Sequence, residues 1–136
     1  IDKTALNEVY IGSRNQFHIS RYILHLNGRK EEHRSSGVLV STGTGSTAWY
    51  YSAGGKPFNY SERKLRFIVR EPFFGRLFKP LFLQGEIPYG QKIKIESTGK
   101  MGVVVLDSNN SYNFDCGDVV EVELSYNPLK VLIPKK

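Results

Sequence analysis

The sequence predicts a mainly β domain: an antiparallel, β-sandwich-like fold of two sheets with one short helix after a glycine-rich loop. Around eight or nine short segments have strand character, turn signals separate them, and only one short segment has helix character. A length of 136 residues fits a single domain, and no linker or internal repeat interrupts it. The hydrophobic fraction of 40% supports a packed core and excludes a disordered chain.

The first third of the chain contains three segments with strand character. Residues 5–12 have mixed polarity, and residues 16–26 form a longer segment that runs into Asn27-Gly28. That dipeptide most favours a two-residue hairpin turn, because both positions tolerate positive φ. The returning segment 29–35 is almost wholly polar, so we expect an exposed edge strand. The apolar residues of the longer segment in period-two register are Phe17, Ile19 and Ile23.

The middle of the chain contains the glycine-rich loop. Residues 37–41, GVLVS, form a continuous apolar run that is typical of a buried strand. After the loop, residues 47–53 are the best candidate for a helix. Ser46 or Thr47 could cap its N-terminus, and Gly54-Gly55 would end it.

The last part of the chain returns to strand character. Alternation is cleanest in QKIKIES, and Thr98-Gly99 after it, followed by an apolar run, predicts a second hairpin. These segments complete the predicted two-sheet fold. The segments concerned are residues 65–70, 91–97, 101–106, 118–124 and 129–134.

Composition limits the classes of protein. The net charge of +6 would attract anions such as nucleic acid, nucleotides or phospholipid. Much of this charge lies in residues 61–80, which form either a solvated rim or a phosphate-facing patch. No apolar run approaches the ~20 residues of a membrane span. Cys116 is the only cysteine, which excludes an internal disulfide and suits a reducing compartment. The chain begins without Met, and we expect a piece of a larger protein.

Metal and triad chemistry are not expected. His18 and His25 are seven residues apart, which places them on opposite faces of an unbroken strand. His33 lies beyond the predicted hairpin, and no Cys or carboxylate cluster completes a metal site. No serine stands in a G-x-S-x-G nucleophile elbow.

The stretch VSTGTGSTAWYYSAGG, residues 40–55, is more informative. In a strand–loop–helix unit, glycines let a ligand approach the backbone, and loop N–H groups can face an anion. Its hydroxyls, on Thr42, Thr44, Ser46 and Thr47, would add donors and acceptors. The loop lacks the G-K-[ST] ending of a Walker loop and the third glycine of G-x-G-x-x-G. Phosphate or nucleotide binding and a structural turn both remain open from spacing alone.

The same stretch resembles the NAD kinase motif S-T-P-T-G-S-T-A-Y-x-x-S-A-G-G, and ALNEVYIG resembles the Asn-Glu motif upstream of it in that family. VVVLDSNNSYNFDCGDVVEVELS resembles the closing segment of the family more loosely. The resemblance covers nearly the whole chain but only the C-terminal half of the family's length. Gly43 replaces the common Pro, Trp49 replaces a Tyr, and Ser36 replaces an acidic residue. With VREP at residues 69–72, these departures resemble the divergent mitochondrial-type branch.

The resemblance implies an NAD site. Asn7 and Glu8 would bind NAD through their polar side chains, and Ser36 takes the place of the missing acid. Each has an alternative: Asn7 and Glu8 could be a solvated strand edge, and Trp49 could be a core residue. The residues expected to bind NAD are Asn7, Glu8, Ser36, Thr44, Thr47, Ala48, Trp49 and Ser52.

The resemblance also implies a reaction. NAD kinases transfer a phosphoryl group from ATP, or inorganic polyphosphate, to the adenosine-ribose 2′-hydroxyl of NAD, giving NADP. An N-terminal domain with a G-G-D-G motif, absent from this chain, would bind the donor and a divalent metal. We therefore expect residues 1–136 to be the C-terminal NAD-binding domain, with no catalytic residue and no metal site, inactive alone. A cytoplasmic or mitochondrial-matrix homo-oligomer, a dimer or tetramer, is expected.

Three other interpretations are compatible with parts of the sequence. A diacylglycerol-kinase-type lipid kinase has a related fold, but the TGTGSTAW and LNE motifs match the NAD kinase side more closely. A basic β module that binds nucleic acid would need aromatic stacking platforms, and the Phe and Tyr residues form no such cluster in sequence. A regulatory relative without turnover is the third alternative, because the acid at Ser36 is replaced. Neither nucleic acid nor a membrane is an expected partner.

Overall fold

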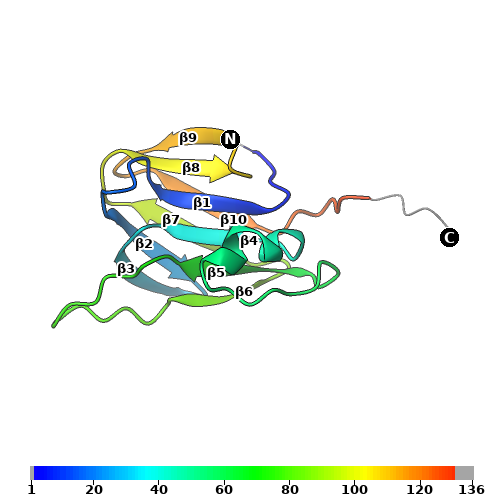
Figure 1. Ribbon diagram of the computed structural model, residues 1–136, viewed down its shortest axis with the longest axis horizontal. Coiled ribbons are helices and arrows are strands. Elements are labelled where there is room, and N and C mark those ends of the chain that lie inside the picture. Colours follow the sequence, from blue (N-terminus) through cyan, green and yellow to red (C-terminus); the bar gives the residue numbers. More distant parts are fainter. Residues whose placement is uncertain (1, 131–136) are drawn as a thin grey trace.

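The computed structural model describes residues 2–130, which form two antiparallel sheets packed as a sandwich (Figure 1). One sheet contains β1 (Glu8–Ser13), β4 (Val38–Ser41), β5 (Lys64–Val69), β6 (Gln84–Pro88), β8 (Gly102–Leu106) and β9 (Asn110–Phe114). The other contains β2 (Ser20–Leu26), β3 (Arg29–Ser35), β7 (Lys92–Ser97) and β10 (Val119–Glu123). The strand orders are β6-β5-β4-β1-β8-β9 and β10-β7-β2-β3. The predicted two-sheet fold is confirmed.

The six-stranded sheet is apolar on both faces at its centre. Its inner face packs against the second sheet, and its largest fully buried side chain is Phe67. Its outer face carries a second apolar cluster, which includes Leu39 and Ile68 and is covered by Tyr50 of a short helix. Successive residues of a strand point to opposite faces, so a strand covered on both sides must be apolar throughout. This explains the continuous run of β4.

The predicted hairpin is confirmed between β2 and β3. Asn27 and Gly28 have φ values of 53° and 73°, as a tight two-residue turn requires. β3 is the edge strand of its sheet, and its charged residues other than Glu31 are exposed. Glu31 shares the inward side with the buried His33 and Ser35, and its carboxylate accepts from Leu81 N–H at 2.9 Å and Phe82 N–H at 2.8 Å.

The predicted register of the second strand is wrong. Phe17 and Ile19 are 83% and 54% exposed, because they precede the strand, which begins only at Ser20. The inward residues of β2 are Tyr22 and Leu24. A polar group is tolerated there because the Tyr22 hydroxyl lies 2.8 Å from Ser35 Oγ, within hydrogen-bond distance.

The second predicted hairpin is also wrong, because β7 and β8 belong to different sheets. The chain crosses between sheets here, and Thr98 N–H donates to the Arg21 carbonyl over 3.0 Å. A turn signal marks the reversal of the chain but not the sheet that receives the next strand. Two strands, β6 and β9, were not expected. Both are edge strands with mixed polarity, which weakens the sequence pattern.

The predicted helix exists but is short. A 3-10 turn, η1 (Thr44–Thr47), leads into α1 (Trp49–Ser52), and Gly54 with φ of 99° ends it as predicted. Ala48 is the N-cap and makes no side-chain capping bond, so capping by Ser46 or Thr47 is wrong. In Figure 1 this helix lies in front of the six-stranded sheet, on the side away from the second sheet.

The predicted closing strand is not formed where the chain is described. Leu129 and Lys130 lie outside any strand, and residues 131–136 lie outside the described residues. Within residues 2–130, no helix is long and apolar enough to cross a membrane.

Candidate functional site

The loop after β4 is bound to the segment that leads into β1. Thr42 N–H donates to the Asn7 carbonyl over 3.0 Å, and Thr42 Oγ1 donates to the Leu6 carbonyl over 2.6 Å. The same hydroxyl accepts from Gly45 N–H at 3.0 Å. The two motifs singled out in the sequence, Asn-Glu and the glycine-rich loop, are therefore brought into one place on the outer face of the sheet.

Close approach explains the glycines of this loop. A Cβ at Gly45 would collide with the backbone of Asn7, and one at Gly43 would lie 2.6 Å from the Asn59 carbonyl oxygen. Three amides of the loop are already bonded inside it: Gly45 N–H to Thr42, Ser46 N–H to the Gly43 carbonyl, and Ala48 N–H to the Gly45 carbonyl. These amides are therefore not free to hold an anion, and the glycines serve packing.

The loop hydroxyls divide into two groups. Thr42 and Ser46 use theirs internally: Ser46 Oγ donates to the Gly43 carbonyl at 2.7 Å and accepts from Phe58 N–H at 3.0 Å. The other predicted residues of the loop and helix are exposed except for Trp49, which is half-buried, and we call the exposed group the ledge. The members of this ledge are Thr44, Thr47, Ala48 and Ser52.

Asp107 holds the Asn-Glu motif in place. Its carboxylate accepts from three consecutive amides: Leu6 at 2.7 Å, Asn7 at 2.7 Å and Glu8 at 3.2 Å. Asp107 lies in the turn between β8 and β9 with φ of 51°, a conformation that Asp tolerates better than most residues. Both backbone groups of Asn7 are thus occupied, while its side chain makes no hydrogen bond to another residue within 2–130.

Glu8 is a buried carboxylate on the outer face of β1, with only 5% of its surface exposed. Burial raises the pKa of the Glu8 carboxyl, and the charge of Asp107 raises this pKa further. Backbone hydrogen bonding at Trp49 opposes the rise. A carboxylate held in this way is costly for folding, which is typical of binding sites.

Trp49, Tyr10, Ser36 and Arg70 form a second group beside the ledge. The Trp49 and Tyr10 rings stack with centroids 5.0 Å apart, and the Arg70 guanidinium carbon lies 5.1 Å from the Trp49 ring centroid. The Tyr10 hydroxyl donates to the Ser36 carbonyl at 2.9 Å, and Ser36 N–H donates to the Arg70 carbonyl at 2.9 Å. Trp49 therefore packs against Tyr10 and Arg70, as in the alternative in which it is a core residue. It directly follows Ala48, a member of the ledge, in the sequence.

The structure therefore places five of the eight predicted residues in the loop and helix over the outer face, Asn7 and Glu8 at the start of β1, and Ser36 in the connection between β3 and β4. The residues that sequence reasoning missed are Tyr10, Arg70 and Asp107. Tyr10 stands two residues after Glu8 and so shares its face of β1, a signal that was available. Asp107 acts across about 100 residues of sequence, and no local pattern reveals such a contact.

The histidines do not form a metal site, and among residues 2–130 no three His, Cys, Asp or Glu side chains come together as ligands. His18 is exposed, and His25 Nε2 lies 3.5 Å from a Glu96 oxygen. His33 is buried with its Nε2 2.9 Å from Glu31 Oε1. Burial lowers the pKa of His33, and Glu31 opposes the shift.

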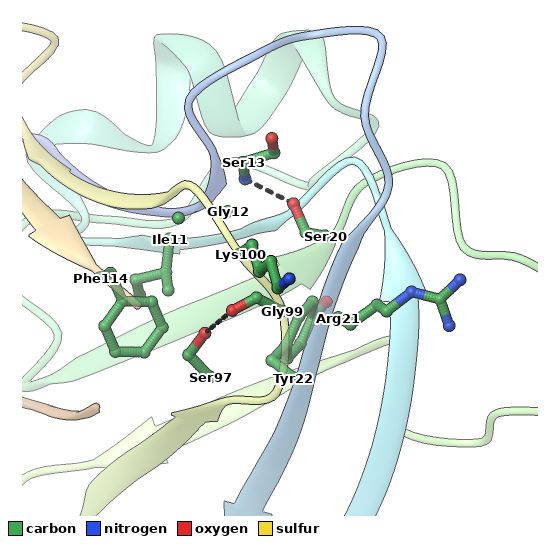
Figure 2. A pocket seen from close by; sticks show the side chains of 11 residues that line it. Ile11, Gly12, Ser13, Ser20, Arg21, Tyr22, Ser97, Gly99, Lys100 and Phe114 are labelled. Atoms are coloured by element: carbon green, nitrogen blue, oxygen red, sulfur yellow. Dashed lines mark hydrogen bonds between the residues drawn. The ribbon is translucent and has the colours of Figure 1, made fainter. Parts of the chain in front are cut away.

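A small cavity between the sheets is not a second ligand site. Its volume is about 10 Å³, space for roughly one water. Figure 2 shows two hydrogen bonds within its wall: Ser13 N–H donates to Ser20 Oγ at 2.6 Å, and Ser97 Oγ donates to the Gly99 carbonyl at 3.3 Å. This cavity is therefore too small to hold a nucleotide.

Residues 6–133 match the family described as the ATP-NAD kinase C-terminal domain. The chain belongs to this family. Among curated proteins, a probable NADH kinase of Oryza sativa subsp. japonica is 30% identical over 96% of this chain, and an NAD kinase of Legionella pneumophila is 31% identical over 96%. The chain spans 42% and 44% of those two proteins, respectively.

Solved structures agree with the family assignment. The crystal structure of an NAD kinase from Archaeoglobus fulgidus in complex with ATP has a TM-score of 0.75 and 27% identity over 90% of this chain and 46% of that one. The structure of yeast NADH kinase complexed with NADH has a TM-score of 0.76 over 89% of this chain and 34% of that one. At 23% identity, the second comparison shows the fold alone.

Proposed function

We propose that this chain is the NAD-binding domain of an NAD kinase. The full-length protein would transfer a phosphoryl group to the adenosine-ribose 2′-hydroxyl of NAD and release NADP. One observation carries the proposal: the Asn-Glu motif and the glycine-rich loop, 35 residues apart at Asn7 and Thr42, are hydrogen-bonded into one site. Membership of the ATP-NAD kinase C-terminal domain family supports it.

The described contacts suit the proposed roles. The Asn7 side chain makes no hydrogen bond to another residue within 2–130, so its amide can donate to and accept from an adenine edge. Glu8 can accept from ribose hydroxyls, and the charge that burial disfavours would gain hydrogen bonds from the ligand. The ledge of Thr44, Thr47, Ala48 and Ser52 offers hydroxyls and a small flat surface against which a purine can lie.

The phosphate donor is expected to bind outside this chain. ATP or polyphosphate, with a divalent metal, would be held by an N-terminal kinase domain. Phosphoryl transfer depends on positioning and on cationic stabilisation of the transferring phosphate. Because we place the donor site in that other domain, we assign no catalytic residue to this chain. The chain by itself should bind substrate without turnover.

A homo-oligomer, a dimer or tetramer, forms part of the same proposal. The segment between β5 and β6, which extends from the body of the domain in Figure 1, exposes Phe74, Leu77 and Leu81. Leu77 is 99% exposed. Exposed apolar groups gathered on one segment are typical of a surface that meets another protein.

The test is a substrate screen with the full-length protein. With ATP or polyphosphate as donor, we expect conversion of NAD or NADH to the 2′-phosphorylated product, and no product from diacylglycerol. Residues 1–136 alone should give no turnover, and sedimentation of the full-length protein should give a dimer or tetramer. Phosphorylation of diacylglycerol with no activity on NAD would contradict the proposal and favour the lipid kinase alternative.

A further inference from the structure

Arg70 places a positive charge at the border of the candidate site. It follows β5 directly. It shares the outer face with Ile68 and Arg66, which precede it by two and four positions, because alternate residues of a strand point to the same face. Its guanidinium lies over the Trp49 ring, at 5.1 Å from the centroid. An aromatic ring under a guanidinium holds it in a defined orientation while leaving its N–H groups free to bond outward.

The charge of Arg70 is poorly compensated. Its nearest carboxylate is that of Glu71, with 3.7 Å between Nη2 and Oε1, and Glu71 is largely exposed. The Arg70 side chain is 25% exposed and that of Glu71 is 66% exposed, and an ion pair that reaches solvent at this distance contributes little. The Arg70 guanidinium also makes no hydrogen bond with any other residue in the range 2–130. Its five N–H donors are therefore available to a ligand.

Arg66 provides a direct contrast on the same face. It also lies over an aromatic ring, that of Phe58 at 4.8 Å, but its donors are occupied. Arg66 donates to Glu86 at 3.0 Å and to the Lys56 carbonyl at 3.0 Å. The Arg66 guanidinium is therefore held by hydrogen bonds within the protein, whereas that of Arg70 has only the 3.7 Å contact with Glu71.

The neighbourhood of Arg70 favours an anion. Ser36, which replaces the acid that the family resemblance leads one to expect, is bonded to the Arg70 carbonyl and supplies no negative charge. Three amides of the nearby loop, those of Gly45, Ser46 and Ala48, are bonded internally and are not available to the anion. A cationic side chain would add the attraction that these amides cannot give, and Arg70 is placed to supply it.

We infer that Arg70 binds a phosphate group of the dinucleotide and gives this site its preference for phosphate-bearing ligands over the bare nucleoside. The inference rests on the proposed function, since it concerns the same site. A guanidinium fork matches two phosphate oxygens, and such charge-assisted bonds are the stronger class of hydrogen bonds. Arg70 is a specificity residue here and has no part in the transfer step.

The test compares Arg70→Gln with Arg66→Gln in the full-length protein by calorimetric titration. With NAD as ligand, Arg70→Gln should lose affinity by about 10- to 100-fold, the range for a hydrogen bond to a charged group. Adenosine, which has no phosphate, should bind both variants as it binds the unmodified protein. Arg66→Gln should keep its NAD affinity, and Arg70→Lys, which retains the charge but not the fork, should recover part of the loss.

Two ligands distinguish the source of the phosphate. If Arg70→Gln lowers the affinity for NAD and NADP equally, Arg70 contacts the pyrophosphate bridge. If it lowers the affinity for NADP alone, Arg70 contacts the 2′-phosphate. Either result supports the inference. Unchanged affinity for both ligands would overturn it. An equal loss for adenosine would overturn it too, because Arg70 would then act through packing on Trp49. Failure of the unmodified protein to bind any NAD would instead contradict the proposed function, and the inference with it.

Discussion

At the scale of a single residue, the buried carboxylate of Glu8 lowers the stability of the fold and is available to bind a ligand. Its carboxylate is 5% exposed and lies near a second carboxylate, Asp107, so ionisation is disfavoured in the folded chain. The pKa of Glu8 is therefore raised above its ordinary value of 4.5. A ligand that donates hydroxyl groups to this carboxylate would compensate for part of the cost of burial.

The cost of burying the ionised Glu8 carboxylate predicts how Glu8→Gln changes stability and NAD binding. Below the unfolded pKa of 4.5 the carboxyl is protonated in both states and costs nothing, and the cost grows as pH rises through the folded pKa. We expect Glu8→Gln to raise the free energy of unfolding at neutral pH, and this gain to vanish near pH ~4. NAD affinity should fall by about 10-fold or more.

Denaturant unfolding at the two pH values and calorimetric titration with NAD check this expectation. Glu123→Gln, which changes an exposed carboxylate of β10, is the matched control and should alter neither quantity. A Glu8→Gln variant that is less stable than the unmodified protein at neutral pH would show that the ionised carboxylate stabilises the fold, and would contradict the account.

The β8–β9 turn sets the geometry of the site at the scale of an element. Asp107 accepts from the amides of Leu6, Asn7 and Glu8, so the turn fixes the entry into β1. The loop after β4 then packs on that entry through Thr42 and Gly45. Three segments far apart in sequence thus depend on one carboxylate.

Asp107→Asn isolates that dependence, because Asn also tolerates the positive φ of the turn. Its amide nitrogen would face an N–H donor, that of Leu6 if the oxygen keeps the bonds to Asn7 and Glu8. We expect the free energy of unfolding to fall by about 1–3 kcal/mol, together with weaker NAD binding. Ser108→Asn, at the next turn position with φ of 56°, is the control and should change neither. Equal behaviour of the two variants would show that the Asp107 contacts do not organise the site.

The sequence predicts the elements that local chemistry determines. Asn27-Gly28 requires its turn, and the buried run of β4 and the alternation of Ile93 and Ile95 follow directly from burial. Elements that depend on distant partners could not be predicted. Thr98-Gly99 gives the same turn signal for a hairpin and for a crossing between sheets, and the edge strands β6 and β9 lack a strong pattern.

The candidate site follows the same division. Asn7, Glu8 and the glycine-rich loop were found through motifs, because their residue types and spacing are visible in the sequence. Arg70 was visible only as one cation in a basic stretch. Its stacking on Trp49 and its weak pairing with Glu71 depend on the folded neighbourhood, so the sequence could not separate it from Arg66.

At the scale of the whole molecule, the net charge of +6 is not gathered into one binding surface. Lys64 and Arg66 share Glu86, with closest distances of 2.7 and 3.0 Å, and the Arg63 guanidinium carbon lies 4.1 Å from the Tyr89 ring centroid. Most of the basic stretch is therefore paired or packed, as in a solvated rim. This arrangement favours a compact anionic ligand at one point over an extended nucleic acid backbone.

The central claim is that NAD binds where the Asn-Glu motif meets the glycine-rich loop. Calorimetric titration of the full-length protein with NAD, repeated on Asn7→Ala and Thr47→Val, tests it most directly, with the exposed Thr98→Val as control. The account predicts saturable binding that each site variant weakens by about 3- to 10-fold, the range for a neutral hydrogen bond, and that the control leaves unchanged. Binding that neither site variant weakens, or no binding by a folded protein, would contradict the account.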